Sequence, residues 1–138
     1  MDKNILIIDS TTAELWVAFV NGNKVIERVC DVQRAHDKNI NRLVKEVLAE
    51  GDGGFASIAA FAVVTGPGSW TGCRVGVAAV KAYAAACSRA KVIELRANSD
   101  RAALVKTAKQ KFAVGDFVTS KELLPFYDGE FVVTTKKH

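Results

Sequence analysis

The sequence predicts an α/β domain built on one mixed sheet, and three features of its 138 residues indicate this class. Two nearly continuous apolar runs, residues 5–8 and 58–64, are typical of strands buried on both faces. Between them, residues 37–50 have the 3.6-residue spacing of an amphipathic helix. A chain of 49% hydrophobic and 25% charged residues with this length can bury a core without metals or disulfides.

The first three elements are predicted to be strands. Residues 5–8 end in the polar turn Asp9-Ser10-Thr11-Thr12. Residues 15–20 and 24–30 are rich in β-branched and aromatic side chains and flank Asn21-Gly22, a pair that readily adopts the positive φ of a tight hairpin. We therefore expect an antiparallel meander.

Helices and strands alternate in the rest of the chain. Helix 37–50 ends at the glycine-rich residues 51–54, and strand 58–64 leads through a Gly/Pro turn into helix 72–88. Strand 91–95 and helix 100–112 follow, with Asn98 or Ser99 as the expected N-cap.

This order matches a ribonuclease-H-like arrangement, a mixed five-stranded sheet with helices on both faces. We predict a single domain, 1–138, in which 1–112 form the lobe and 113–138 a C-terminal extension. Within the extension, residues 117–119 and 131–135 are candidates either for short strands or for an irregular segment, and the extension is a candidate remnant of a second lobe.

Several protein classes are excluded by composition. Cys30, Cys73 and Cys87 lack metal-ligand spacing and are interpreted as reduced core thiols. The N-terminus lacks the pattern of a secretory signal, and the longest apolar run is too short for a membrane span. A net charge of +4 permits weak contact with nucleic acid. We expect a cytoplasmic protein that does not contact membranes.

Residues 65–76, TGPGSWTGCRVG, are the most distinctive segment. Its glycines and proline suit a sharp strand-to-helix turn, and its hydroxyls can cap the backbone N–H groups that follow. Such a turn can hold a phosphate at a helix N-terminus, although the Gly-Lys-Ser/Thr ending of a P-loop is absent. A purely structural turn is the favoured interpretation, and the candidate phosphate-binding residues are Asp9, Thr11, Gly66, Gly68, Ser69 and Thr71.

The same segment resembles the GPGSFTGLRIG signature of the bacterial TsaB (YeaZ) family, with mild departures at Trp70, Cys73 and Val75. Asp9-Ser10-Thr11-Thr12 is similar to that family's Asp-Thr-Ser-Thr start, and Arg34-Ala35-His36 to its Arg-x-His. The resemblance covers residues 1 to about 104, and Pro125-Phe126-Tyr127 resembles the family's C-terminal Pro-x-Tyr.

The resemblance implies an actin-like ATPase (ASKHA) fold, normally of two lobes, whereas this sequence stops where the second would develop. It also implies a non-catalytic scaffold that activates TsaD in forming N6-threonylcarbamoyladenosine at position 37 of tRNA. Implied partners are a TsaD-like protein in a heterodimer, a TsaE-like ATPase and a second copy of the chain, with tRNA contacted only indirectly. No intrinsic cofactor is implied; ATP and magnesium would bind at the partner or at the heterodimer interface.

The residues themselves also argue against catalysis. ATP-using proteins of this fold have glycine where Thr11 stands, because a Cβ there crowds the phosphate. Asp9 could orient a magnesium-bound water, but an aspartate that caps a turn is commoner. His36 and His138 are far apart, so we predict no metal site. The alternative function is a small nucleotide-binding enzyme of the actin-like group, kinase- or peptidase-like.

The predicted helix 72–88 is informative about protein partners, because it is apolar on nearly all sides. Such a helix is buried on both sides, by its own domain or by a second chain. One stripe contains Gly72, Gly76, Ala79, Tyr83 and Ala86, and a second contains Val75, Ala78, Ala82 and Ala85. Because the resembled family pairs through its first two helices, the predicted interface consists of Ile40, Val44, Val47, Gly72, Val75, Gly76, Ala79 and Tyr83.

Overall fold

The computed structural model describes residues 3–31 and 36–126, without the side chains at positions 36, 37, 70 and 71. Its five strands are β1 (Asn4–Asp9), β2 (Leu15–Asn21), β3 (Lys24–Cys30), β4 (Ile58–Val64) and β5 (Lys91–Leu95). The helices are α1 (His36–Glu50), α2 (Trp70–Ala86) and α3 (Arg101–Val114), with single 3₁₀ turns at Phe55–Ser57 and Ser120–Glu122.

The strands form one sheet in the order β3-β2-β1-β4-β5. The meander β1-β2-β3 is antiparallel, with Ile7 opposite Ala18 and Ala18 opposite Glu27. Strands β4 and β5 are parallel to β1. The predicted mixed five-stranded sheet of the ribonuclease-H-like and actin-like class is therefore confirmed.

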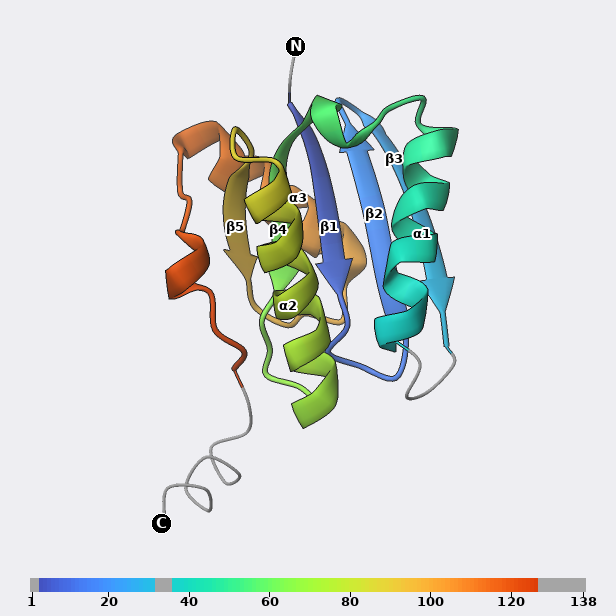
Figure 1. The fold of residues 1–138 in the computed structure, drawn as a ribbon, viewed down its shortest axis with the longest axis vertical. Coiled ribbons are helices and arrows are strands. Elements are labelled where there is room, and N and C mark those ends of the chain that lie inside the picture. The colour runs from blue at the N-terminus through green and yellow to red at the C-terminus, as the bar shows by residue number, and fades with distance from the viewer. Residues whose placement is uncertain (1–2, 32–35, 127–138) are drawn as a thin grey trace.

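Helices cover both faces of this sheet, α1 and α2 on one and α3 on the other (Figure 1). Because side chains alternate along a strand, Leu6 and Ile8 of β1 join the α1/α2 core while Ile5 and Ile7 join the α3 core. This double burial explains the continuous apolar runs of β1 and β4. Among the described residues, no helix combines the length and apolarity needed to cross a membrane.

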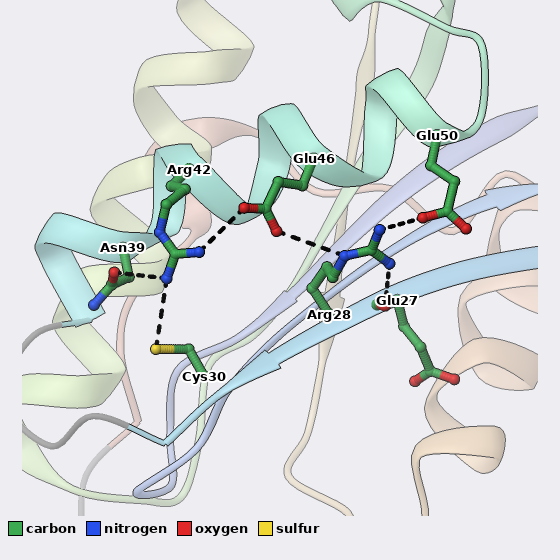
Figure 2. A network of polar contacts seen from close by, with 7 residues as sticks. All are labelled: Glu27, Arg28, Cys30, Asn39, Arg42, Glu46 and Glu50. Carbon is green, nitrogen blue, oxygen red and sulfur yellow. Dashed lines mark hydrogen bonds and ion pairs between the residues drawn. The ribbon is translucent and has the colours of Figure 1, made fainter.

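An exposed polar network ties α1 to the edge strand β3 (Figure 2). Arg28 of β3 pairs with Glu50 and lies 3.5 Å from Glu46, and Glu46 in turn pairs with Arg42 at 3.1 Å. The hydrogen bond from Arg28 to Glu50 raises the pKa of the guanidinium above its ordinary value. Because these side chains are exposed to solvent, the network contributes little net stability.

Two local predictions are corrected. The β2–β3 turn is centred on Gly22 and Asn23 rather than on Asn21-Gly22, because Asn21 still pairs with Lys24; Gly22 has a φ of 64°. Asp100, rather than Asn98 or Ser99, caps α3, where its carboxylate accepts the backbone N–H of Ala102 at 3.0 Å.

The segment 115–126 runs beside β5 and back to the end of β4 (Figure 1). Val118 forms one antiparallel bridge with Val92, in place of the short strand expected at 117–119. Leu123 is completely buried in the α1/α2 core. We call this segment the strap. The strand candidate at 131–135 lies outside the described residues.

Candidate functional site

The glycine-rich turn connects β4 to α2 at the carboxyl end of the parallel strands. Gly66 has a φ of 131°, which suits glycine, and the Gly66-Pro67 peptide bond is cis. Ser69 caps α2 by accepting the N–H of Gly72 at 3.0 Å, as the sequence predicts. The backbone at Thr71 forms the first turn of α2, and its side chain lies outside the described atoms.

The end of β1 packs directly on this turn. A Cβ at Gly68 would lie 2.6 Å from Cβ of Thr11, and the Ser69 N–H donates to the carbonyl of Thr11 at 3.2 Å. Ser10 Oγ donates to the carbonyl of Gly72 at 2.5 Å. The loop after β1 and the glycine-rich turn are therefore in direct contact.

Asp9 is buried, and one of its carboxylate oxygens accepts two hydrogen bonds from Thr11, from N at 2.9 Å and from Oγ1 at 2.6 Å. This is the turn-capping role that the sequence favoured. The candidate phosphate-binding residues with described side chains thus come together, but the hydroxyls of Thr11 and Ser69 and this oxygen of Asp9 already bond to groups within the chain.

The strap adds contacts to this turn that sequence patterns did not predict. The N–H of Phe126 donates to the carbonyl of Thr65 at 2.7 Å, and Cys73 Sγ lies 3.7 Å from the carbonyl of Phe126. A Cβ on Gly66 would overlap that same carbonyl. The guanidinium of Arg96 lies 4.4 Å from the centre of the Phe126 ring. The strap therefore covers the outer side of the glycine-rich turn.

A polar pocket of about 380 Å³ opens beside Asp9, with Glu14, Asp100 and Arg101 in its lining. Arg101 pairs with Glu14 at 2.8 Å, and Asp100 caps α3. Within residues 3–31 and 36–126, no group of three or more His, Cys, Asp or Glu side chains is arranged to hold a metal ion.

A second candidate site is the groove between α1 and α2, with a volume of about 550 Å³. Its lining is mainly apolar and small: Ile40, Asn41, Arg74, Val75, Ala78, Ala79, Ala82 and Tyr83. Ala78 and Ala82 are exposed to solvent, and Val75, Ala79 and Tyr83 are half-buried. An exposed stripe of small apolar side chains permits close approach of another helix.

The orientation predicted for two interface glycines is corrected by this geometry. A Cβ at Gly76 would lie 2.7 Å from Ser10 Oγ and 3.3 Å from Val63, and a Cβ at Gly72 would overlap the carbonyl of Ser10. Both glycines therefore face the sheet. Val44 and Val47 are also buried in the core, whereas Ile40 is buried but lines the groove.

Of the predicted interface, Ile40, Val75, Ala79 and Tyr83 thus line the groove. The lining residues that the predicted set omits include Ala78 and Ala82. These two residues could have been predicted from the second stripe of the helix, because its 3- and 4-residue spacing is as regular as that of the first.

Tyr83 is one of three polar residues in the groove lining, with Asn41 and Arg74. Its hydroxyl donates to the side-chain oxygen of Asn41, which links α2 to α1. Its ring contacts those of Phe55 and Phe61, with centroids 5.2 and 5.8 Å away. Burial raises the pKa of the Tyr83 hydroxyl above its ordinary value of about 10.

The remaining candidate residues are the two histidines, Arg34 and the three cysteines. His36 begins α1, but its side chain is not described, and His138 and Arg34 lie outside the described residues. No disulfide joins the three cysteines, all of which lie in the described part of the chain. Cys73 is fully buried, whereas Cys30 and Cys87 are only half-buried.

A family model described as "TsaD: tRNA N6-adenosine threonylcarbamoyltransferase" matches residues 29–97 of the chain. That region contains α1, β4, the glycine-rich turn, α2 and β5. No curated protein matches the sequence.

Two solved structures from Pseudomonas aeruginosa are similar in fold. One is an uncharacterized protein with similarity to peptidase YEAZ, with 24% identity and a TM-score of 0.64 over 67% of this chain and 43% of its own. The other is YeaZ, with 22% identity and a TM-score of 0.62 over 67% of this chain and 42% of its own. The chain thus spans about two fifths of the length of either structure, and the resemblance to TsaB (YeaZ) proteins seen in the sequence is confirmed.

Proposed function

Because the chain belongs to the family of TsaD, the tRNA N6-adenosine threonylcarbamoyltransferase, we propose that it acts in threonylcarbamoylation of tRNA adenosine 37. In this proposal it is a non-catalytic scaffold that binds a TsaD-like enzyme and favours that enzyme's active state. A TsaE-like ATPase and a second copy of the chain are further proposed partners.

The observation that carries this proposal is the α1/α2 groove. Ala78 and Ala82 are exposed on a helix whose opposite side is already buried, so their apolar character does not serve the chain's own core. A groove between two helices that exposes small side chains beside Tyr83 provides a surface into which helices of a second protein can pack.

The non-catalytic role is supported by the glycine-rich turn. Thr11 and Ser69 direct their hydroxyls to groups within the chain, and Thr11 stands against Gly68 where a phosphate would approach. In the proposal, ATP and magnesium bind at the partner or at the heterodimer interface. The alternative, a nucleotide-binding enzyme of the actin-like group, would require these loops to separate.

Two measurements test the proposal. The tagged chain is co-expressed with the TsaD-like protein of the same cell, and we expect the two to co-purify. Ala82→Glu places a charge in the groove and is expected to abolish co-purification. Ala102→Glu, the same exchange at an exposed position of α3, is the matched control and leaves the complex intact.

The proposal fails if the two proteins do not associate, or if Ala82→Glu and Ala102→Glu co-purify equally well. Titration with ATP distinguishes the scaffold from the alternative function. Tight binding of ATP by the isolated chain that is lost in Asp9→Ala would identify a nucleotide-binding enzyme.

A further inference from the structure

A third pocket lies on the face of the sheet opposite the α1/α2 groove. It has a volume of about 490 Å³ and forms where the start of β1, the β2–β3 turn and the last two turns of α3 meet. Its lining includes Lys3, Ile5, Val20, Asn23, Lys109 and Phe112. The volume is within the range of small-ligand sites.

The floor and the rim of this pocket differ in chemistry. Ile5 and Val20 are each 1% exposed and make an apolar floor. Phe112 forms a half-buried aromatic wall, held by Phe117 at a centroid distance of 5.8 Å. Lys3 and Lys109 are exposed at the rim, and the lining contains no carboxylate.

The charges at the rim are available to a ligand. Within the part of the chain that the structure describes, neither Lys3 nor Lys109 forms an ion pair; Lys109 donates to the carbonyl of Gly22 at 3.2 Å. Lys106 lies one turn before Lys109 and is exposed, and α3 contains no acidic residue. The C-terminal end of α3 adds only about half a negative charge, so three ammonium groups keep the region positive.

We propose that this pocket binds a nucleotide of single-stranded RNA. The base would lie against Phe112 and the apolar floor, with the Asn23 amide near its edge, and the phosphates would be bound by Lys3, Lys109 and Lys106. Unpaired bases on an aromatic side chain beside basic groups are the usual way in which proteins bind single strands. The positive rim is complementary to the backbone and excludes an apolar peptide as the preferred occupant.

This inference rests on the proposed function, in which the modified molecule is a tRNA, and it departs from the expectation that tRNA is contacted only indirectly. Helix α3, whose last turns line the pocket, covers one face of the sheet, and α1 and α2, which line the groove, cover the other (Figure 1). An RNA strand and a partner protein could therefore bind at the same time. The loops and the single-stranded end of a tRNA provide the required unpaired nucleotides.

The test is fluorescence polarisation of a short labelled single-stranded RNA with the full chain at low salt. Three variants are compared with the natural sequence: the double variant Lys3→Gln/Lys109→Gln, Phe112→Leu, and Lys45→Gln. Lys45 is exposed on α1, so its substitution removes one positive charge from the other face, half the charge that the double variant removes. Circular dichroism and co-purification with the TsaD-like protein are measured for each variant.

We expect the double variant to bind about tenfold more weakly and to lower the dependence of log affinity on log salt by about 1.4, since each contact to a single strand contributes about 0.7. Phe112→Leu keeps the apolar volume but removes the aromatic face, and is expected to weaken binding about fivefold. Lys45→Gln is expected to bind like the natural sequence. Retained co-purification in all three variants separates this test from that of the proposed function.

Four results would overturn the inference: no binding of the single strand, equal losses for Lys45→Gln and the double variant, equal affinity for a duplex RNA, or an unchanged affinity in Phe112→Leu. Binding of free AMP is measured as well. If AMP binds and the single strand does not, the pocket takes a small nucleotide and the assignment to RNA is wrong.

Discussion

The inner and outer sides of α2 are both made of small apolar residues, yet they have different uses. On the inner side, Gly72 and Gly76 bring the helix into contact with Ser10, and Val80 is completely buried. On the outer side, Ala78 and Ala82 remain exposed. The inner residues are explained by packing within the chain, whereas the outer ones are not.

This difference shows that residue size alone does not identify an interface. A glycine can be required because a neighbouring backbone is close, whereas exposed alanines that line a groove are not required by packing within their own chain. The predictions that follow compare matched substitutions on the two sides of α2, beginning with the largest expected effect.

Gly76→Leu is expected to unfold the chain or to destabilise it by about 3 kcal/mol or more, because even a Cβ would lie 2.7 Å from Ser10 Oγ. Ala82→Leu, on the exposed side, is expected to change the free energy of unfolding by less than about 0.5 kcal/mol. Urea denaturation followed by circular dichroism measures both. Equal stabilities of the two variants would mean that the inner side of α2 is not close-packed.

The second comparison removes buried volume instead of adding it. Val80→Ala is expected to cost about 2 kcal/mol, because its side chain is fully buried beside the sheet. Val75→Ala, at the half-buried groove, is expected to cost less than half as much. The same denaturation curves give both values, and a larger loss for Val75→Ala would reverse the assignment of sides.

The regular elements of this fold could be predicted from the sequence because each has its own pattern. The strands at 24–30, 58–64 and 91–95 have the predicted bounds, and helix 37–50 begins one residue earlier. Burial by the neighbouring layers requires apolar residues at regular positions, and this pattern is visible in a single sequence.

The orientation of α2 could not be predicted in the same way. Its two stripes are both apolar, so periodicity does not determine which side of the helix faces the sheet. The first stripe is in fact divided, because Gly72 and Gly76 face the sheet whereas Ala79 and Tyr83 line the groove. The choice depends on the carbonyl and hydroxyl of Ser10, which lies 62 residues from Gly72 in sequence. The strap was missed for a related reason, since Phe126 contacts the turn mainly through backbone atoms that every residue has.

A third prediction concerns the start of α2, which positions both sides of the helix. Ser69→Ala removes the acceptor for the N–H of Gly72 and is expected to destabilise the chain by about 1 kcal/mol. Ser69→Asp restores an acceptor and is the control, expected to recover most of the loss. If both variants lose the same stability, the hydroxyl matters for a reason other than capping.

The smallest expected effect is a pH dependence from Tyr83, at the border between the two sides. Its pKa is raised by burial in the folded chain, so the unfolded chain loses the tyrosine proton first as pH increases. The contribution of Tyr83 to stability is therefore complete below about pH 10 and declines as pH rises from there through the folded-state pKa.

Tyr83→Phe keeps the ring contacts with Phe55 and Phe61 but removes the ionisable group and the hydrogen bond to Asn41. We expect the stability difference between the natural chain and this variant to shrink between about pH 9 and about pH 11. Tyr127→Phe changes the second of the two tyrosines and serves as the control. Urea denaturation across this pH range checks the prediction, and a difference that stays constant or widens would mean that the Tyr83 hydroxyl is not held neutral by burial beside the groove.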